Sequence, residues 1–241
     1  MSEQEIIIEN KYIIKKLIGE GMFGKVFLAE NKYTNEHVAI KIDSTILLKN
    51  EARIYRLLVD MKGVPKLRSF GVIDKYNYMI LDNLGDSLED LKKESGEKFD
   101  MVTTLTMGIQ MIQRIKDIHA MNIIHRDIKP ENFLISPQRG KNLLYIIDFG
   151  LSKLYKINNK HITCEVNRPV VGTLPFVSLN IHAGFTPSRR DDIESIGYIL
   201  LYLLNGKLPW SKIKDTIKTS ERTQENIEKK TFHMKKEESM W

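Results

Sequence analysis

Short apolar segments separated by turn residues dominate the first third of the chain. Five segments are rich in β-branched and aromatic residues, which is typical of strands, at residues 12–18, 25–30, 37–42, 66–73 and 76–82. Polar residues at 31–35 and 74–75 supply turns between them. One helix is expected to interrupt these strands and to end at Gly63, because apolar residues recur near the helical period at Ile46, Leu47, Ile54, Leu57, Leu58 and Met61.

Beyond Gly85 the apolar spacing becomes helical. One long amphipathic helix, with these positions on its buried face, is predicted from steps of three and four residues at Leu105, Ile109, Ile112, Ile115 (or Lys116) and His119. A second helix is predicted from Ile193, Ile196, Leu200 and Leu203, with Asp191 and Asp192 in its first turn, where carboxylates favour the helix dipole. Two short strands, at residues 133–135 and 143–147, lie between them. Strands first and helices later predict an α+β protein with two lobes.

The composition is that of an ordinary globular protein. The 241 residues are 42% hydrophobic and 28% charged, which suits one large domain or two compact lobes. The 37 Lys and Arg residues outnumber the 31 Asp and Glu residues by six. This modest excess fits anionic ligands such as nucleotide phosphates or acidic peptides. Since no basic stripe interleaved with aromatic residues accompanies it, we predict no nucleic-acid partner.

The cellular context is indicated by what the sequence lacks. Cys164 is the single cysteine, which excludes an internal disulfide or a cysteine metal cluster and favours a reducing compartment. Residues 1–10 are acidic and do not read as a signal peptide, and no apolar run reaches membrane-spanning length. We therefore expect an intracellular protein of the cytoplasm, the nucleus or both, without membrane insertion.

A glycine-rich motif, Gly19-Glu20-Gly21-Met22-Phe23-Gly24-Lys25-Val26, follows the first predicted strand. A dinucleotide-binding fold needs a helix after such glycines, but the residues that follow read as a strand. A P-loop has the same Gly19 and Gly24-Lys25 spacing, but Val26 stands where its Ser or Thr belongs. A glycine-rich hairpin can lay backbone N–H groups over phosphates. On this motif alone, a plain hairpin without a ligand remains an equal alternative.

Three later motifs occur in a fixed order. Val38-Ala39-Ile40-Lys41 lies on the third predicted strand, His125-Arg126-Asp127-Ile128-Lys129-Pro130-Glu131-Asn132 follows the long helix, and Asp148-Phe149-Gly150 follows a short strand. Together with the glycine hairpin they resemble the protein kinases. The resemblance implies ATP and Mg²⁺ as cofactors. It implies that Lys41 pairs with phosphates and with Glu51, that Asp127 accepts the substrate proton, that Lys129 reaches the γ-phosphoryl group, and that Asn132 and Asp148 bind Mg²⁺.

The chain resembles the casein kinase 1 family of Ser/Thr kinases, from about Tyr12 to about Trp210. The catalytic loop ends in Asn132-Phe133-Leu134, the run Ser188-Arg189-Arg190-Asp191-Asp192-Ile193-Glu194-Ser195-Ile196-Gly197-Tyr198 is similar, and Ser178-Leu179-Asn180 replaces the usual Ala-Pro-Glu. The resemblance implies a bilobal kinase fold that phosphorylates Ser and Thr hydroxyls of protein substrates. Its β-rich N-lobe with one helix would span residues 12–82, and its mainly helical C-lobe residues 83–241, together one domain.

The resemblance also implies site residues. The ATP site would comprise Ile18, Gly19, Glu20, Gly21, Met22, Phe23, Gly24, Lys25, Val26, Ala39, Lys41, Glu51, Asp82 and Leu84. Leu81 would be the gatekeeper, Asp82, Asn83 and Leu84 the hinge, and Asp192 the residue that holds the catalytic loop. An anion and substrate site would include Arg126, Lys153, Arg168, Gly206 and Lys214. The alternative for the basic residues is that they are solvated charges.

Two departures from the family pattern stand out. Gly172-Thr173-Leu174-Pro175 replaces Gly-Thr-Ala-Arg, so Pro175 stands where an Arg would read phosphate or acid upstream of the target residue. The family domain also continues for several helices after the Leu208-Pro209-Trp210 motif, so an incomplete lower C-lobe after residue 210 is expected. The rival hypothesis is a catalytically weak, kinase-like nucleotide-binding or scaffold protein. The presence of Lys41, Asp127 and Asp148 opposes it.

Overall fold

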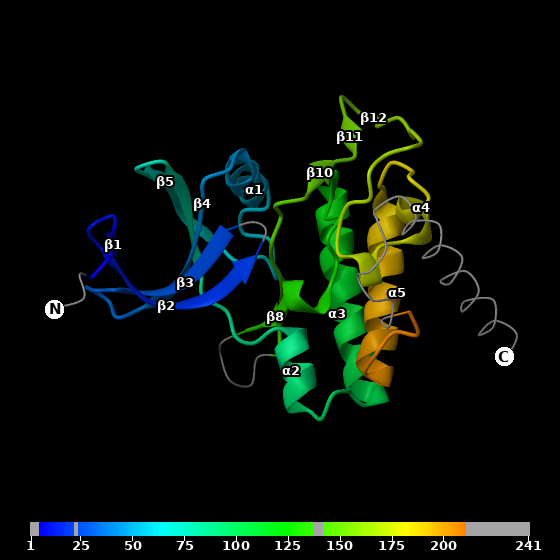
Figure 1. Ribbon diagram of the computed structural model, residues 1–241, viewed down its shortest axis with the longest axis horizontal. Helices are drawn as coiled ribbons and strands as arrows, with labels where there is room; N and C mark the ends of the chain where they lie inside the picture. Colours follow the sequence, from blue (N-terminus) through cyan, green and yellow to red (C-terminus); the bar gives the residue numbers. More distant parts are fainter. Residues whose placement is uncertain (1–4, 22–23, 137–141, 211–241) are drawn as a thin grey trace, which may run out of the picture. The chain divides into compact units, whose positions relative to one another are not determined.

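The structure is a computed structural model that describes residues 5–21, 24–136 and 142–210 (Figure 1). Within these residues the chain forms two compact units. One falls in Met1–Asp86 and Leu134–Gly150, and the other in Ser87–Phe133 and Leu151–Trp241. The first unit therefore collects two stretches that are distant in sequence. The lobe boundaries expected at residues 82 and 83 stay a prediction.

A six-stranded antiparallel sheet forms the first unit. Its strands are β1 (Ile7–Ile8), β2 (Tyr12–Gly21), β3 (Gly24–Asn31), β4 (His37–Asp43), β5 (Leu67–Ile73) and β6 (Tyr76–Asp82). Their order in the sheet is β1-β2-β3-β4-β6-β5. Alternating apolar residues of neighbouring strands meet in a core cluster that includes Ala29, Val38, Ile40 and Ile80, each with no exposed surface. All five predicted strands are present, and β1 is an addition that the sequence did not predict.

Helix α1 (Ile46–Leu57) belongs to the same unit. The Thr45 hydroxyl caps its N-terminus by accepting a hydrogen bond from the Leu47 N–H at 3.3 Å. The predicted end at Gly63 is wrong, because the helix stops at Leu57. A residue in the left-handed region, Asp60 with φ 60°, turns the chain before Gly63 is reached.

Two short strands complete the first unit. β8 (Phe133–Ile135) pairs with β9 (Leu144–Ile146), as the sequence predicts. The Ile146 N–H donates to the Gly63 carbonyl at 2.8 Å, and the Gly85 N–H donates to the Ile135 carbonyl at 3.0 Å. These bonds attach the late segment 134–150 to the early part of the chain. The residue that follows β9 by two positions, Asp148, thereby becomes part of this unit.

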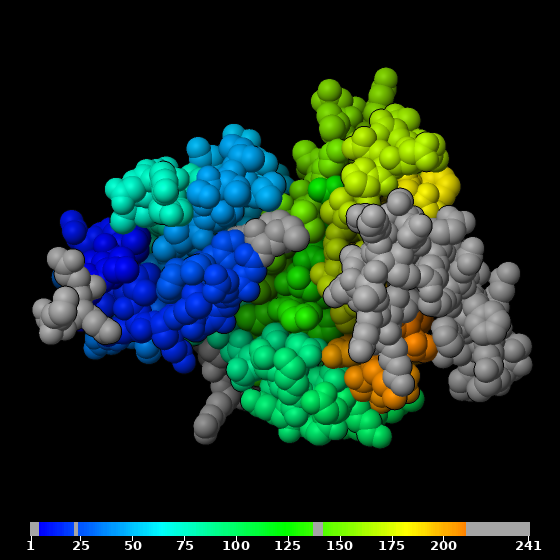
Figure 2. All heavy atoms as spheres, in the orientation of Figure 1, coloured from blue at the N-terminus to red at the C-terminus, as the bar shows by residue number. Residues whose placement is uncertain are grey.

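The second unit is mainly helical. Its helices are α2 (Leu88–Glu94), α3 (Met101–Ala120), α4 (Leu179–His182) and α5 (Arg189–Asn205), with 3₁₀ turns η1 (Pro130–Asn132) and η2 (Leu174–Phe176). Strand β7 (Ile123–Ile124) pairs with β10 (Lys153–Leu154), and β11 (Lys156–Ile157) pairs with β12 (Lys160–His161). The β11–β12 hairpin protrudes from the rest of this unit (Figures 1 and 2). A β-rich unit with one long helix and a helical unit confirm the α+β class.

Helices α3 and α5 lie side by side in the second unit (Figure 1). Gly108 faces Leu200, and a Cβ on this glycine would lie only 2.9 Å from a methyl carbon of Leu200. The prediction of the buried face of α3 is partly wrong. Ile115 and His119 are buried as expected, but Leu105, Ile109 and Ile112 are 53%, 71% and 47% exposed. The face of α3 that packs against α5 is instead the neighbouring one, which carries Gly108.

Helix α5 is capped at both ends. Ser188 and Asp191 form a capping box at its start, where the predicted Asp191 and Asp192 occupy the first turn. Gly206 ends the helix with φ 78°, and a Cβ there would lie 2.8 Å from the Glu97 carbonyl oxygen. In the described part of the chain, no helix combines the length and the apolar character needed to cross a membrane.

Candidate active site

The first unit contains a buried lysine with two carboxylate partners. Lys41 on β4 stands opposite Val26 on β3 and Met79 on β6. Its Nζ donates to Glu51 Oε2 at 2.8 Å and to Asp148 Oδ1 at 2.9 Å. Lys41 is 9% exposed and Glu51 1% exposed. The lysine and helix partner predicted from the sequence are therefore in contact, and the Asp148 carboxylate joins them.

Burial and the neighbouring charges shift the pKa values of Glu51 and Lys41. Burial raises the pKa of Glu51 to about 7, although the ammonium of Lys41 opposes this change. Burial alone would lower the pKa of Lys41, but the two neighbouring carboxylates outweigh it and raise that pKa above its usual value. Lys41 is therefore a permanently charged donor, held in place by two acceptors. Such a point charge is suited to binding phosphate oxygens.

Tyr55 positions the loop that carries Asp148, and sequence reasoning missed it. The Asp148 N–H donates to the Tyr55 hydroxyl oxygen at 3.3 Å, and the Tyr55 ring packs edge-on against Phe149 with ring centroids 4.9 Å apart. Asp148 itself has φ 64°, an uncommon conformation for a residue other than glycine. The signal in the sequence was available, since Tyr55 follows Glu51 by one helical turn on the buried face of α1.

The glycine-rich motif forms the β2–β3 hairpin. Gly21 pairs with Gly24 at its end, and a strand follows, as the hairpin interpretation predicts. Gly24 has φ 97°, and a Cβ there would lie 2.3 Å from the Ile42 carbonyl oxygen, so only glycine fits. Exposed Lys25 and Glu20 form an ion pair at 3.2 Å. Met22 and Phe23 lie outside the described residues.

The predicted hinge begins at the end of β6. Asp82 is the last residue of this strand, and its carboxylate accepts a hydrogen bond from Arg68 Nε at 2.7 Å. Leu81 stands opposite Ala39 on the neighbouring strand β4. The side chain of Asp82 is thus occupied within the sheet, and Leu84 follows in a segment outside helices and strands.

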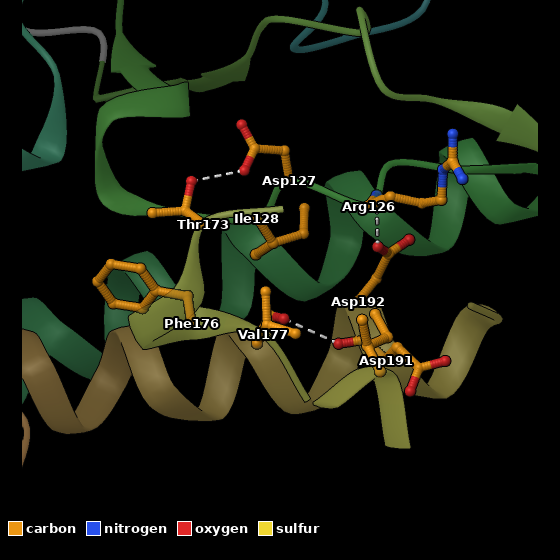
Figure 3. Close-up of a pocket in the computed structure, with 10 residues that line it drawn as sticks. Arg126, Asp127, Ile128, Thr173, Phe176, Val177, Asp191 and Asp192 are labelled. Atoms are coloured by element: carbon orange, nitrogen blue, oxygen red, sulfur yellow. Dashed lines mark hydrogen bonds between the residues drawn. The ribbon is translucent and has the colours of Figure 1, made fainter. Parts of the chain in front are cut away.

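The catalytic-loop motif converges on Asp127 in the second unit. Lys129 Nζ lies 2.9 Å from Asp127 Oδ2, and Asn132 Nδ2 donates to the Asp127 carbonyl oxygen at 2.8 Å. The Thr173 hydroxyl donates to Asp127 Oδ1 at 2.7 Å (Figure 3). Asp127 is 4% exposed. Its carboxylate is therefore held in one orientation by a cation and a hydroxyl.

Thr173 and Gly172 are part of this arrangement, and sequence reasoning assigned no role to either. Gly172 has φ 108°, and a Cβ there would lie 2.6 Å from the Arg126 carbonyl oxygen. This close approach brings Thr173 to Asp127. A Gly-Thr pair in a segment otherwise poor in glycine was the available signal, but only the fold reveals its partner.

Asp192 fixes the backbone of the catalytic loop, as the sequence predicts. Its Oδ2 accepts from the His125 N–H at 2.9 Å. Its Oδ1 accepts from the Arg126 N–H, also at 2.9 Å (Figure 3). Arg126 has φ 69°, so the residue directly before Asp127 has a strained backbone conformation. The bonds to a buried carboxylate stabilise that conformation.

A family model described as protein kinase domain matches residues 12–240. The chain belongs to the protein kinase family. Membership implies ATP as the phosphoryl donor and proteins as the acceptors. Kinase domains typically use Mg²⁺ with ATP.

The kinase domain has oxygen donors that suit Mg²⁺ in both units. Asp148 offers a carboxylate. Asn132 is 4% exposed and its amide nitrogen donates to the Asp127 carbonyl oxygen, so the amide oxygen of Asn132 faces away from that bond. Both are hard oxygen ligands of the kind Mg²⁺ prefers. Residues 5–21, 24–136 and 142–210 contain no group of three or more His, Cys, Asp or Glu side chains able to hold a metal. Mg²⁺ is usually held by one or two carboxylates together with substrate phosphates, so such a group is not required.

Three of the predicted basic residues of the kinase domain line one pocket. Arg126, Lys153 and Arg168 surround it together with Thr186. Burial lowers the pKa of Arg126, Asp192 opposes this, and the like charge of Arg168 lowers the pKa further. Two guanidinium groups and an ammonium around one pocket favour an anion there. Gly206 serves as the C-cap of α5, and Lys214 lies outside the described residues.

Proposed function

We propose that this kinase domain phosphorylates Ser and Thr residues of proteins, with casein kinase 1-like character. The observation that carries the proposal is the arrangement at Asp127, whose carboxylate is held by Lys129 and Thr173. The Lys129 position separates the chain from tyrosine kinases, which carry a different catalytic-loop pattern. The resemblance of residues 125–134 and 188–198 to the casein kinase 1 family supports the finer assignment.

In this proposal Asp127 orients the attacking hydroxyl. The substrate O–H donates to the Asp127 carboxylate, which takes the proton as the hydroxyl oxygen bonds to the γ-phosphorus and the bond to ADP breaks. Lys129 lies 2.9 Å from Asp127 and neutralises negative charge on the transferring group. Since both groups are fixed before substrate arrives, little reorganisation accompanies the reaction.

The nucleotide phosphates are assigned to the first unit. Lys41, oriented by Glu51, binds phosphate oxygens, and the backbone of the β2–β3 hairpin covers them. Residues Ile18–Val26, Ala39, Asp82 and Leu84 complete the proposed ATP site. Asp148 and Asn132 would hold Mg²⁺, which when bound offsets the negative charge of the phosphates.

The remaining sequence expectations join the proposal. The N-lobe is assigned to residues 12–82 and the C-lobe to residues 83–241. The pocket of Arg126, Lys153 and Arg168 is proposed to bind an anion of the substrate, and the protein is placed in the cytoplasm, the nucleus or both. The presence of Lys41, Asp127 and Asp148 in bonded positions favours an active enzyme over a scaffold.

A phosphotransfer assay tests the proposal. The protein is incubated with radiolabelled ATP and four peptides that differ only in the acceptor, which is Ser, Thr, Tyr or Ala. We expect transfer to the Ser and Thr peptides, dependence on added Mg²⁺, and no transfer to the Tyr or Ala peptides. Casein serves as an acidic protein substrate in a parallel reaction.

Asp127→Asn is the matched control, because the amide keeps the shape of the carboxylate but cannot take the proton. Transfer to the Tyr peptide at the rate of the Ser peptide would contradict the proposed acceptor class. Nucleotide binding without any transfer, in parent and control alike, would favour the scaffold alternative.

A further inference from the structure

Arg68 lies in a β-bulge at the edge of the six-stranded sheet. Strand β5 is last in the strand order, and its pairing with β6 shifts register between Leu67 and Ser69. Arg68 is therefore an extra residue between two consecutive pairs. A bulge re-aims the side chain of its extra residue, and here the Nε–H of Arg68 donates to Asp82 Oδ1 at 2.7 Å. The motifs in the sequence leave Arg68 without a role.

Asp82, the last residue of β6, is held at both of its carboxylate oxygens. Arg68 donates to Oδ1, and the Lys66 N–H donates to Oδ2 at 3.1 Å. The Asp82 N–H donates in turn to the Lys66 carbonyl oxygen at 3.2 Å. The backbone and the side chain of Asp82 are therefore both bonded to residues at the start of β5.

Glu36 holds the other end of the Arg68 guanidinium. It directly precedes β4, and its carboxylate accepts from Nη1 of Arg68 at 2.7 Å and from Nη2 at 2.5 Å. The Glu36 carbonyl oxygen also accepts from the Asn31 N–H at 2.9 Å, in the turn between β3 and β4. The charged side chains are partly exposed. An isolated ion pair at the surface contributes little, whereas a bidentate pair within a network of three charges restrains its members.

The segment that follows β6 is anchored again three residues later. The Gly85 N–H donates to the Ile135 carbonyl oxygen, and the Ile135 N–H donates to the Asp86 carbonyl oxygen, both at 3.0 Å. A Cβ on Gly85 would lie 3.1 Å from Cγ1 of Ile135, so the two stretches of chain approach closely. Two residues, 83–84, therefore lie between this anchor on β8 and the anchored Asp82.

We propose that Arg68 is a positioning residue for nucleotide binding, which fixes Asp82 through its Nε–H and so holds residues 83–84 in the conformation that receives the adenine. The inference rests on the proposed ATP site, which includes Asp82 and Leu84. A segment that is held before the ligand arrives loses less conformational freedom on binding. Loss of the bond from Arg68 is therefore expected to weaken nucleotide binding, although Lys41, which is assigned to the phosphates, is untouched.

Two substitutions of nearly the same shape separate the bond to Asp82 from the rest of the guanidinium. In Arg68→Gln the amide nitrogen takes the place of Nε and can donate to Asp82, whereas Arg68→Met places a methyl group there. Both variants lose the ion pair with Glu36. We expect the Kd of a fluorescent ATP analogue to rise about fivefold in Arg68→Met and to stay within about twofold of the parent in Arg68→Gln. Equal Kd values in the two variants would overturn the proposal.

Adenosine shows whether the effect belongs to the adenine end of the nucleotide. It carries no phosphate, so its binding does not depend on Lys41. Measured by displacement of the fluorescent analogue, adenosine should lose about the same factor of five in Arg68→Met as ATP does. A loss that appears with ATP and is absent with adenosine would contradict the role given to Arg68.

Glu36→Gln controls for loss of stability in the sheet. It removes the charge of the pair with Arg68 and leaves the bond from Nε to Asp82 in place. The melting temperature should fall slightly, and the Kd of the ATP analogue should stay within about twofold of the parent. A rise in Kd equal to that of Arg68→Met would mean that nucleotide binding follows the stability of the sheet, which refutes a specific role for the Nε bond.

Amide hydrogen exchange in the ligand-free protein gives a readout that needs no activity. We expect the Asp82 amide to exchange about fivefold faster in Arg68→Met than in Arg68→Gln, and equal exchange would also overturn the proposal. If the parent binds nucleotide but transfers no phosphate, the proposed phosphotransfer fails, while the Kd comparison still decides the role of Arg68. Absence of nucleotide binding in the parent would overturn both.

Discussion

Replacing Lys41 with Met should make the free energy of unfolding depend on pH in a new way. Methionine preserves most of the apolar stem but removes the ammonium that lies 2.8 Å from Glu51 and 2.9 Å from Asp148. Because Glu51 is only 1% exposed, water cannot solvate its charge once the ammonium is removed. Removing one partner of a buried ion pair costs about 3–5 kcal/mol when the other group stays charged. In the variant the carboxyl of Glu51 takes up a proton instead.

The sign of the pH dependence follows from the pKa of Glu51. In the parent this pKa is about 7, above the 4.5 of an exposed glutamate, so its contribution to stability is present below pH 4.5 and is lost as the pH rises through 7. Without the ammonium the pKa rises further. Above pH 7 the folded variant therefore keeps a proton that the folded parent has released. The variant loses about 1.4 kcal/mol relative to the parent for each pH unit above 7, and below pH 7 the difference is constant.

Urea unfolding of parent and variant at several values between about pH 6 and pH 8.5 measures this difference. Lys25→Met is the matched control, because Lys25 is exposed and pairs with exposed Glu20 at the surface. Its effect on stability should be small and the same at every pH. A Lys41→Met difference that stays constant from pH 6 to pH 8.5 would refute the view that Glu51 is a buried carboxyl balanced by Lys41.

Four further predictions concern single positions. Asp127→Asn should lower phosphotransfer by about 10²–10⁴ while binding of a fluorescent ATP analogue persists; wild-type turnover would rule out the role given to Asp127. Asp148→Ala should abolish Mg²⁺-dependent transfer, and added Mg²⁺ should not restore it. Pro175→Arg should raise about tenfold the kcat/KM ratio between peptides with phosphoserine and with alanine three residues before the acceptor, whereas a large ratio already in the parent would mean that another basic group reads the phosphate. Gly172→Ala should lower stability by about 1–3 kcal/mol in thermal unfolding, because its Cβ would lie 2.6 Å from the Arg126 carbonyl oxygen at φ 108°; an unchanged melting temperature would contradict this close approach.

The sheet was predictable because its strands are short, β-branched and separated by turns. The buried face of α3 was not. Leu105, Ile109 and Ile112 have the apolar period, yet the helix packs on α5 through the neighbouring stripe that holds Gly108. Both stripes satisfy a helical period, and only the partner helix decides between them. Periodicity therefore located the helix but could not choose its face.

The candidate site divides in the same way. Lys41, Asp127 and Asp148 were predictable because each lies in a motif with distinctive residue types and spacing, and the motifs follow one another in a distinctive order. Thr173 and Tyr55 were not predicted, because each acts through contacts with residues far away in sequence. The glycine before Thr173 and the helical spacing of Tyr55 from Glu51 mark these two positions in the sequence, but neither signal identifies the partner residue. Such supporting residues become visible only when the fold brings the two segments together.

The composition of the first unit has a consequence for synthesis of the protein. Lys41 and Asp148, which are hydrogen-bonded in the folded state, are 107 residues apart. A ribosome adding about 5–20 residues per second needs roughly 5–20 s to supply the second after the first. Throughout that interval the nascent chain contains Lys41 and Glu51 but lacks both Asp148 and strand β9. Translational pausing within residues 87–147 would prolong this incomplete state, in which the emerging chain is a natural client for chaperones.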